Sequence, residues 1–157
     1  GVPAACEAAV RAVQEQYLAD DTDAILLIDA SNAFNAINRK AALHNIARVC
    51  PPMEKICRNT YGADIPLFLP GGVVLYSREG TCQGDPLAMA MFALAVAPMI
   101  CKLREQHPDV NQCWYADDGE SGGRLAAVHS FWKSIEEIGP KYGYYPNAAK
   151  TVLLVKP

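Results

Sequence analysis

The sequence predicts an α+β fold, in which a small, mostly antiparallel sheet has helices packed on one face. Three observations favour this class. The chain has 157 residues, 51% of them hydrophobic and 20% charged, which is enough for one domain with a core and too apolar for a disordered segment. Short continuous apolar runs are typical of buried strands, and segments with helical spacing of apolar residues lie between them. Neither a repeat nor a linker divides residues 1–157, so we expect one domain.

The first elements are a helix, a strand and a second helix. Residues 4–19 are predicted as a helix, and residues 24–28 as a buried strand that ends abruptly at Asp29. Asn38 is a suitable N-cap, because its side-chain oxygen can accept from a free amide of the first turn. It therefore predicts a helix over residues 39–49.

A short helix and a hairpin are expected next. Pro51-Pro52 stops the preceding helix, and a short helix is predicted over residues 53–61. Two apolar segments, residues 65–69 and 73–76, flank Pro70-Gly71-Gly72. Apolar runs on both sides of a Pro-Gly turn indicate a β-hairpin.

The second half of the chain begins with a long helix. Asp85-Pro86 combines a capping residue with a proline at the first helical position, and the helix should run to about Gln106. Because this segment is apolar nearly all round, we expect it to be buried, and Pro98 should kink or divide it.

The last three elements are a strand, a helix and a strand. Residues 112–116 are predicted as a strand that ends at Asp117-Asp118. An apolar stripe predicts a helix over residues 125–138, and residues 151–155 are the final predicted strand.

The charge balance argues against a self-sufficient nucleic-acid binder. The chain has 14 Lys and Arg against 17 Asp and Glu, a net charge of -3, and contains no Lys/Arg run. Phosphate neutralisation supplies most of the affinity of such binders, which therefore present a basic face. Either this chain does not bind nucleic acid, or the basic surfaces lie elsewhere.

Three carboxylates follow two of the predicted strands: Asp29 after the first, and Asp117 and Asp118 after the second. A charge at the edge of a buried strand is costly unless it is compensated, and a divalent cation is the simplest compensation for three. Mg²⁺ prefers such oxygen ligands, and two such ions can hold the attacking and leaving oxygens of a phosphoryl transfer. The alternative is that these residues cap turns.

The segment between these carboxylates contains a glycine-rich turn. Gly80 and Gly84 permit close backbone approach or a positive φ, and they precede a predicted helix N-terminus, where anionic groups are favoured. The alternative is an ordinary capped helix.

Four motifs in order resemble those of the palm domain of a reverse transcriptase, of the kind found in non-LTR retroelements. They span residues 29–151, most of the chain. The motifs are D-x-x-x-x-F at Asp29–Phe34, Q-G-D-P-L at Gln83–Leu87, Y-x-D-D at Tyr115–Asp118, and a weaker G-x-x-x-N-x-x-K-T at Gly143–Thr151. Y-x-D-D alone is common, whereas the ordered set is highly specific. The resemblance identifies residues 1–157 as a palm.

The resemblance implies a metal site and a nucleotide site. Asp29 and Asp117 would bind both catalytic Mg²⁺ ions, for which Mn²⁺ could substitute, with Asp118 assisting and the Ala30 carbonyl as a further ligand. Residues near the incoming nucleotide would be Asn32, Ala33, Phe34, Gln83 and Gly84. Phe34 matches the family's steric gate against a ribose 2′-hydroxyl, with core packing as the alternative.

Three further residues have roles by resemblance. Tyr115 and Ala116 would lie near the primer end. Lys150 could neutralise or protonate the leaving pyrophosphate, although a surface lysine beside a strand is the alternative.

Several features depart from the family. The fingers segment before Asp29 and the thumb after the last strand are largely absent, so the rest of a parent polyprotein would supply them. Their basic surfaces would also explain the acidic charge of a palm. Residues 119–123 are not the usual apolar strand, which leaves the second half of that hairpin in doubt.

The expected function is RNA-dependent DNA polymerisation, in which a primer 3′-hydroxyl attacks the α-phosphorus of a dNTP. The partners would be an RNA or DNA template with its primer, and this fragment alone should have little activity. Two alternatives stay open: an inactive palm that only packs or binds, and another two-metal palm enzyme such as a nucleotidyl cyclase.

Location is expected to be intracellular, either nuclear or cytoplasmic. The N-terminus lacks the pattern of a secretory signal, and the longest apolar run, residues 86–100, is too short to span a membrane. Six cysteines without a C-x-x-C pair are typical of reduced thiols. We therefore expect neither secretion nor membrane association.

Overall fold

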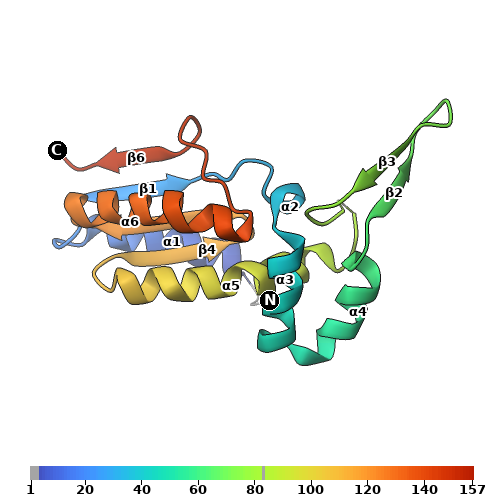
Figure 1. Cartoon of the computed structure of the whole chain (residues 1–157). Helices are drawn as coiled ribbons and strands as arrows, with labels where there is room; N and C mark the ends of the chain where they lie inside the picture. Colours follow the sequence, from blue (N-terminus) through green and yellow to red (C-terminus); the bar gives the residue numbers. More distant parts are fainter. Residues whose placement is uncertain (1–3, 83) are drawn as a thin grey trace.

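The structure is a computed structural model that describes residues 4–82 and 84–157 (Figure 1). The first seven elements are α1 (Ala5–Leu18), β1 (Ala24–Ile28), α2 (Ala33–Ala36), α3 (Arg39–Val49), α4 (Pro51–Tyr61), β2 (Ile65–Phe68) and β3 (Val74–Ser77). The other six are α5 (Ala88–Gln106), β4 (Asn111–Tyr115), β5 (Asp118–Gly123), α6 (Leu125–Ile138), the short 3₁₀ helix η1 (Gly139–Tyr142) and β6 (Val152–Val155).

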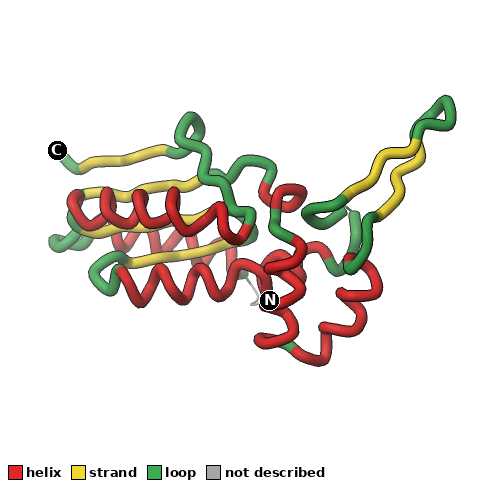
Figure 2. The backbone as a smooth tube through the Cα atoms, in the orientation of Figure 1, coloured by secondary structure: helices red, strands yellow, loops and turns green. Residues whose placement is uncertain are grey.

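Two antiparallel sheets confirm the predicted fold class. The larger sheet has the strand order β4-β5-β1-β6, and every neighbouring pair in it is antiparallel. The strands β2 and β3 form a separate two-stranded ribbon that projects from the rest of the chain (Figure 2). Strand β1 lies inside the larger sheet, and its sequence is continuously apolar rather than alternating.

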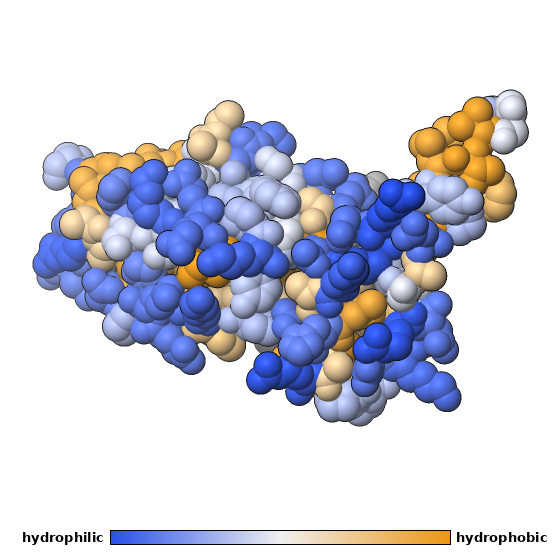
Figure 3. Space-filling model, viewed as in Figure 1, coloured by the Kyte–Doolittle hydropathy of each residue, from blue (hydrophilic) through white to orange (hydrophobic). Residues whose placement is uncertain are grey.

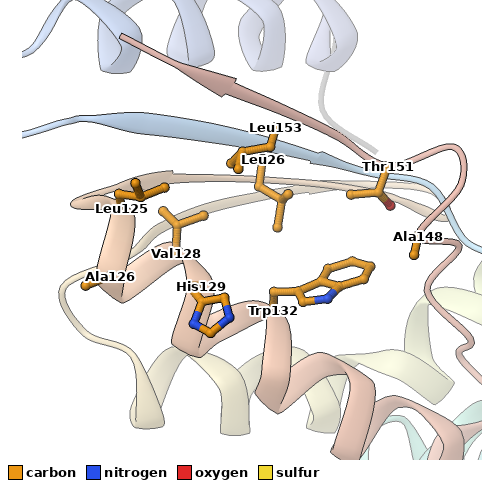
Figure 4. A pocket seen from close by; sticks show the side chains of 9 residues that line it. All are labelled: Leu26, Leu125, Ala126, Val128, His129, Trp132, Ala148, Thr151 and Leu153. Atoms are coloured by element: carbon orange, nitrogen blue, oxygen red, sulfur yellow. The ribbon is translucent and has the colours of Figure 1, made fainter. Parts of the chain in front are cut away.

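Helices cover both faces of the larger sheet, whereas the sequence predicted one covered face. Successive strand residues point to opposite faces. In β1, Ile25 faces α1, and Leu26 faces α6 (Figure 4). Helix α6 packs on β1 and β5 with α5 beside it, and α1 packs on β1, β4 and β5 from the other side (Figure 1). A helix is needed on the second face of the sheet because β1 is apolar on both faces.

Helix α5 differs from its prediction in extent and in burial. It begins at Ala88, because Asp85 and Pro86 form a turn in which an Asp85 side-chain oxygen accepts from the Leu87 amide at 2.8 Å. Pro98 lies inside the helix without dividing it. Only one side is buried, and Met89 on the other side is 54% exposed. The core lies between α3, α5 and α6 and includes Ile46, Phe92, Met99, Phe131 and Ile135.

Residues 119–123 form the second half of the β4–β5 hairpin, as part of strand β5. These residues form a central strand, and two glycines make it possible because neighbouring side chains lie against the backbone. A Cβ on Gly119 would lie 2.9 Å from the Trp114 ring, and one on Gly122 would lie 2.4 Å from Ile25 Cδ1. The strand lacks apolar side chains because its neighbours already fill that space.

The remaining elements agree with the sequence to within a few residues, except that the short helices α2 and η1 were not predicted. The Asn38 side chain accepts from the Ala41 amide at 2.9 Å, which confirms the predicted cap of α3. All six cysteines are free thiols. Across the described residues, no helix has the length and apolar character needed to cross a membrane.

Candidate active site

Asp29 follows β1, and the last segment of the chain holds its backbone in place. The Asp29 amide donates to Thr151 Oγ1 at 3.4 Å, and the Asn147 amide donates to the Asp29 carbonyl at 2.8 Å. Lys150 extends from the same segment, with its Nζ 3.8 Å from Asp29 Oδ1. The backbone of Asp29 is thus held by residues that lie 118 or more positions further along the chain.

Asp117 and Asp118 lie at the turn between β4 and β5. Tyr115 pairs with Asp118, so Ala116 and Asp117 form a two-residue turn, in which Ala116 has a φ of 53°. A left-handed conformation is uncommon outside glycine, and tight hairpin turns favour it. The register pairs Gly119 with Ile28, so the turn and the end of β1 lie at the same edge of the sheet.

The charges of Asp29 and Asp117 act on Asp118. Partial burial raises the pKa of Asp118, and the nearby charges of Asp117 and Asp29 raise it further. Burial raises the pKa of Tyr144, and the charges of Asp117, Asp118 and Asp29 raise it further. The Tyr144 hydroxyl donates to the Asp117 carbonyl at 3.0 Å. Asp29, Asp117 and Asp118 therefore lie at the same edge of the sheet, near enough for the charges of Asp29 and Asp117 to act on Asp118.

The donor chemistry of this cluster fits a divalent cation. Asp29 Oδ1 is buried and has no hydrogen-bond partner among the described residues, so it is available to a ligand. Carboxylate and carbonyl oxygens are the ligands that Mg²⁺ prefers. Within residues 4–82 and 84–157, however, no three His, Cys, Asp or Glu side chains are arranged to hold an ion by themselves.

The predicted nucleotide-binding residues lie beside the cluster, around α2. Asn32 has a φ of 49° and Ala33 is buried. Phe34 packs on Phe92, with ring centroids 4.6 Å apart, but is only partly buried. It therefore contacts the core and still presents surface, which accommodates both interpretations from the sequence.

The glycine-rich turn lies against the same segment. The Thr81 amide donates to the Phe34 carbonyl at 2.7 Å, and the Gly80 amide donates to the Ile37 carbonyl at 2.9 Å. Gly84 has a φ of 87°, and a Cβ there would meet none of the described atoms within 4 Å. Gln83, which was predicted to touch the nucleotide, lies outside the described residues.

Comparison with known proteins decides the family. The family described as "Reverse transcriptase (RNA-dependent DNA polymerase)" matches residues 6–157. The chain belongs to the reverse transcriptase family. No significant match was found among curated proteins.

Solved telomerases share the fold of this reverse transcriptase domain. Apo telomerase from Candida tropicalis, truncated from its C-terminal domain, aligns with a TM-score of 0.75 and 16% identity, covering 96% of this chain and 35% of that one. Telomerase from Candida albicans in complex with a TWJ fragment of telomeric RNA aligns with a TM-score of 0.68 and 11% identity, covering 97% and 30%. The chain thus spans about a third of the length of these proteins.

Sequence reasoning missed two side chains that support the site of this reverse transcriptase domain. Tyr144 holds the Asp117 carbonyl, and Thr151 accepts from the Asp29 amide. Both lie in the weak fourth motif, which was a signal for them. Tyr115, which was predicted to lie near the primer end, is 51% exposed beside the turn.

Proposed function

We propose that this domain is the palm of an RNA-dependent DNA polymerase of the non-LTR retroelement type, which adds dNTPs to a primer 3′-hydroxyl. The observation that carries the proposal is that Asp29 meets Asp117 and Asp118 at one edge of the sheet, in a chain of the reverse transcriptase family. In the reaction the primer 3′-hydroxyl attacks the α-phosphorus of a dNTP, and pyrophosphate leaves.

The residues that would hold two Mg²⁺ or Mn²⁺ ions are Asp29, Asp117, Asp118 and the Ala30 carbonyl. Bound there, the ions would neutralise the charge that develops on the transferring phosphoryl group. The protein's own contribution is positioning, because β1 and the β4–β5 turn present the carboxylates from rigid elements.

Other residues would bind the substrates. Asn32 and Ala33 would lie along the triphosphate, Phe34 would crowd a 2′-hydroxyl, and Gly84 with Gln83 would contact nucleotide and template. Tyr115 and Ala116 would face the primer end. Lys150 lies 3.8 Å from the Asp29 carboxylate, and it would neutralise or protonate the pyrophosphate from there.

The partners would be an RNA or DNA template with its primer, and the fingers and thumb of the parent protein. The net charge of -3 favours this division, because the basic surfaces that grip phosphates would lie on those parts. The location would be intracellular, nuclear or cytoplasmic.

Primer extension by the full-length protein tests the proposal. Asp29→Asn and Asp117→Asn should each abolish extension without unfolding the protein, and Asp118→Asn should reduce it less. The exposed Asp20→Asn is a matched control that should extend like the wild type. Near wild-type extension by Asp29→Asn or Asp117→Asn would contradict the assignment. A folded wild type that binds primer–template without extending it would indicate a binding module instead.

A further inference from the structure

A buried arginine holds the segment that leads to the glycine-rich turn. Arg39 begins α3 and is only 4% exposed. Its guanidinium donates to the main-chain carbonyls of Ser77 at 2.8 Å, Glu79 at 2.9 Å and Gly80 at 2.9 and 3.1 Å. It also donates to Ser77 Oγ at 3.0 Å. Burying a charge is costly unless it is fully hydrogen bonded, so these acceptors explain how Arg39 is tolerated.

All of these acceptors lie between Ser77 and Gly80. The Glu79 carboxylate completes the contact, because it accepts from the Arg39 amide at 2.7 Å. The planar guanidinium fork orients several carbonyls at once, which a lysine ammonium does not do. Arg39 therefore fixes the direction in which the chain enters the turn.

Tyr61 holds the other end of the turn. It is 1% exposed, and its ring lies under the Arg39 guanidinium, 5.3 Å from centroid to carbon. The Tyr61 hydroxyl donates to the Asp85 carboxylate and accepts from the Cys82 amide at 3.2 Å. Burial, with Asp85 beside it, raises the pKa of Tyr61 to about 12, so the phenol stays protonated and donates at neutral pH.

The segment is held from α2 as well. Gly80 and Thr81 donate to the carbonyls of Ile37 and Phe34, as described above. A Cβ on Gly80 would lie 2.2 Å from the Asn35 carbonyl oxygen, so the two backbones are in close contact. The turn is thus held between the Phe34 segment on one side and the Arg39–Tyr61 pair on the other.

We propose that Arg39 and Tyr61 are positioning residues for nucleotide binding, because they hold Gly80–Cys82 and Asp85, the described parts of the glycine-rich turn, beside the Phe34 segment. The inference rests on the proposed polymerase function. Neither residue need touch a substrate. Both act through the backbone of the turn, so their loss should weaken dNTP binding more than it slows the chemical step.

Tyr61→Phe is the sharpest variant, because it keeps the buried ring and removes only the hydroxyl. Tyr142→Phe is the control, since Tyr142 packs against the core, partly buried, and lies on η1 instead of beside the turn. In steady-state primer extension by the full-length protein, Tyr61→Phe should raise the KM for dNTP about fivefold to tenfold, with kcat within about twofold. A purely structural loss would lower the active fraction, and hence the apparent kcat, at unchanged KM.

Arg39→Lys provides a graded second variant that keeps the charge. It should raise the KM for dNTP at least as much as Tyr61→Phe, because an ammonium cannot replace the fork. If Arg39→Lys does not fold, Tyr61→Phe still decides the question.

Amide hydrogen exchange gives a readout that does not need catalysis. In Tyr61→Phe, peptides covering residues 78–87 should exchange at least about fivefold faster, while Tyr142→Phe should match the wild type. Unchanged exchange in that segment would overturn the positioning role whatever the kinetics. Faster exchange with an unchanged KM in an active wild type would overturn its link to nucleotide binding. A folded wild type without extension would refute the polymerase function, and the nucleotide role with it.

Discussion

The phenol of Tyr144 donates a hydrogen bond to the main-chain carbonyl of Asp117, at 3.0 Å and across 27 residues of chain. Tyr144 is 1% exposed, and its ring meets Trp114 edge to face, with centroids 5.8 Å apart. The fourth motif therefore supports the turn that carries two of the three carboxylates. This contact connects the end of the chain to the candidate site.

Tyr144→Phe should loosen that turn while leaving the core packed. The loss of one buried hydrogen bond costs about 1 kcal/mol, which corresponds to roughly 2–4 °C in Tm for a chain of this size. Extension should fall severalfold, because Asp117 is then held less firmly. Thermal unfolding and primer extension measure both effects. Tyr76→Phe on the exposed ribbon is the control, and an equal Tm for the two variants would contradict the supporting role.

Phe34→Val tests the steric gate. Removing the ring opens space beside the sugar, so the preference for dNTP over rNTP should fall on the order of tenfold or more. The variant should also lose about 1 kcal/mol of stability, because the contact with Phe92 is lost.

Phe92→Leu separates the two roles of Phe34. It disturbs the same ring contact from the other side, so it should lower Tm without changing sugar selectivity. Steady-state kinetics with dNTP and with rNTP measure the sugar selectivity of both variants. Unchanged selectivity in Phe34→Val would place Phe34 in the core alone.

Asp118→Asn should stabilise the metal-free protein at neutral pH. The folded protein raises the pKa of Asp118 above its ordinary value of 3.8, mainly through burial and then through Asp117 and Asp29. A raised carboxyl pKa means that stability is lost as pH rises from the unfolded pKa through the folded one. Asp118→Asn has no ionisable carboxyl at this position, so it does not lose this stability as the pH rises.

The gain should therefore be present at neutral pH and absent near pH 3. Because Asp118 is largely exposed to solvent, the gain should be no more than about 2 °C in Tm. Thermal unfolding in EDTA at both pH values measures it, and millimolar Mg²⁺ should then favour the wild type. A variant that is less stable than wild type in EDTA at pH 7 would indicate that Asp118 is a turn cap.

Gly143→Ala should be strongly destabilising. Gly143 has a φ of 77°, and a Cβ there would lie 2.2 Å from the Asn38 amide nitrogen. Gly71→Ala is the control, because Gly71 has a φ of 85° but a Cβ there would meet no described atom within 4 Å.

The two substitutions share the backbone strain, and only one adds a clash. Gly71→Ala should cost about 1 kcal/mol, whereas Gly143→Ala should cost several. Denaturant unfolding measures the difference. Similar losses would mean that the α3 N-terminus moves away from Gly143 without penalty.

Much of the fold was predictable because its signals are local. The apolar run of β1 and the cap at Asn38 depend on residues that are neighbours in sequence. The same holds for the place of Asp29 and of Asp117-Asp118 after their strands, and for the family motifs around them. That these carboxylates lie together follows from antiparallel pairing, which the sequence predicted only in outline.

The sequence by itself determined the strands other than β5, most of the helices and the motifs that carry the chemistry. Only the tertiary structure decided that residues 118–123 form a strand, because Trp114 and Ile25 occupy the space that side chains on Gly119 and Gly122 would need. It also decided that Arg39 and Tyr61 hold the glycine-rich turn, since their partners lie 21 to 41 positions away. Such contacts have no local pattern, because they depend on which distant segments the packed core brings together.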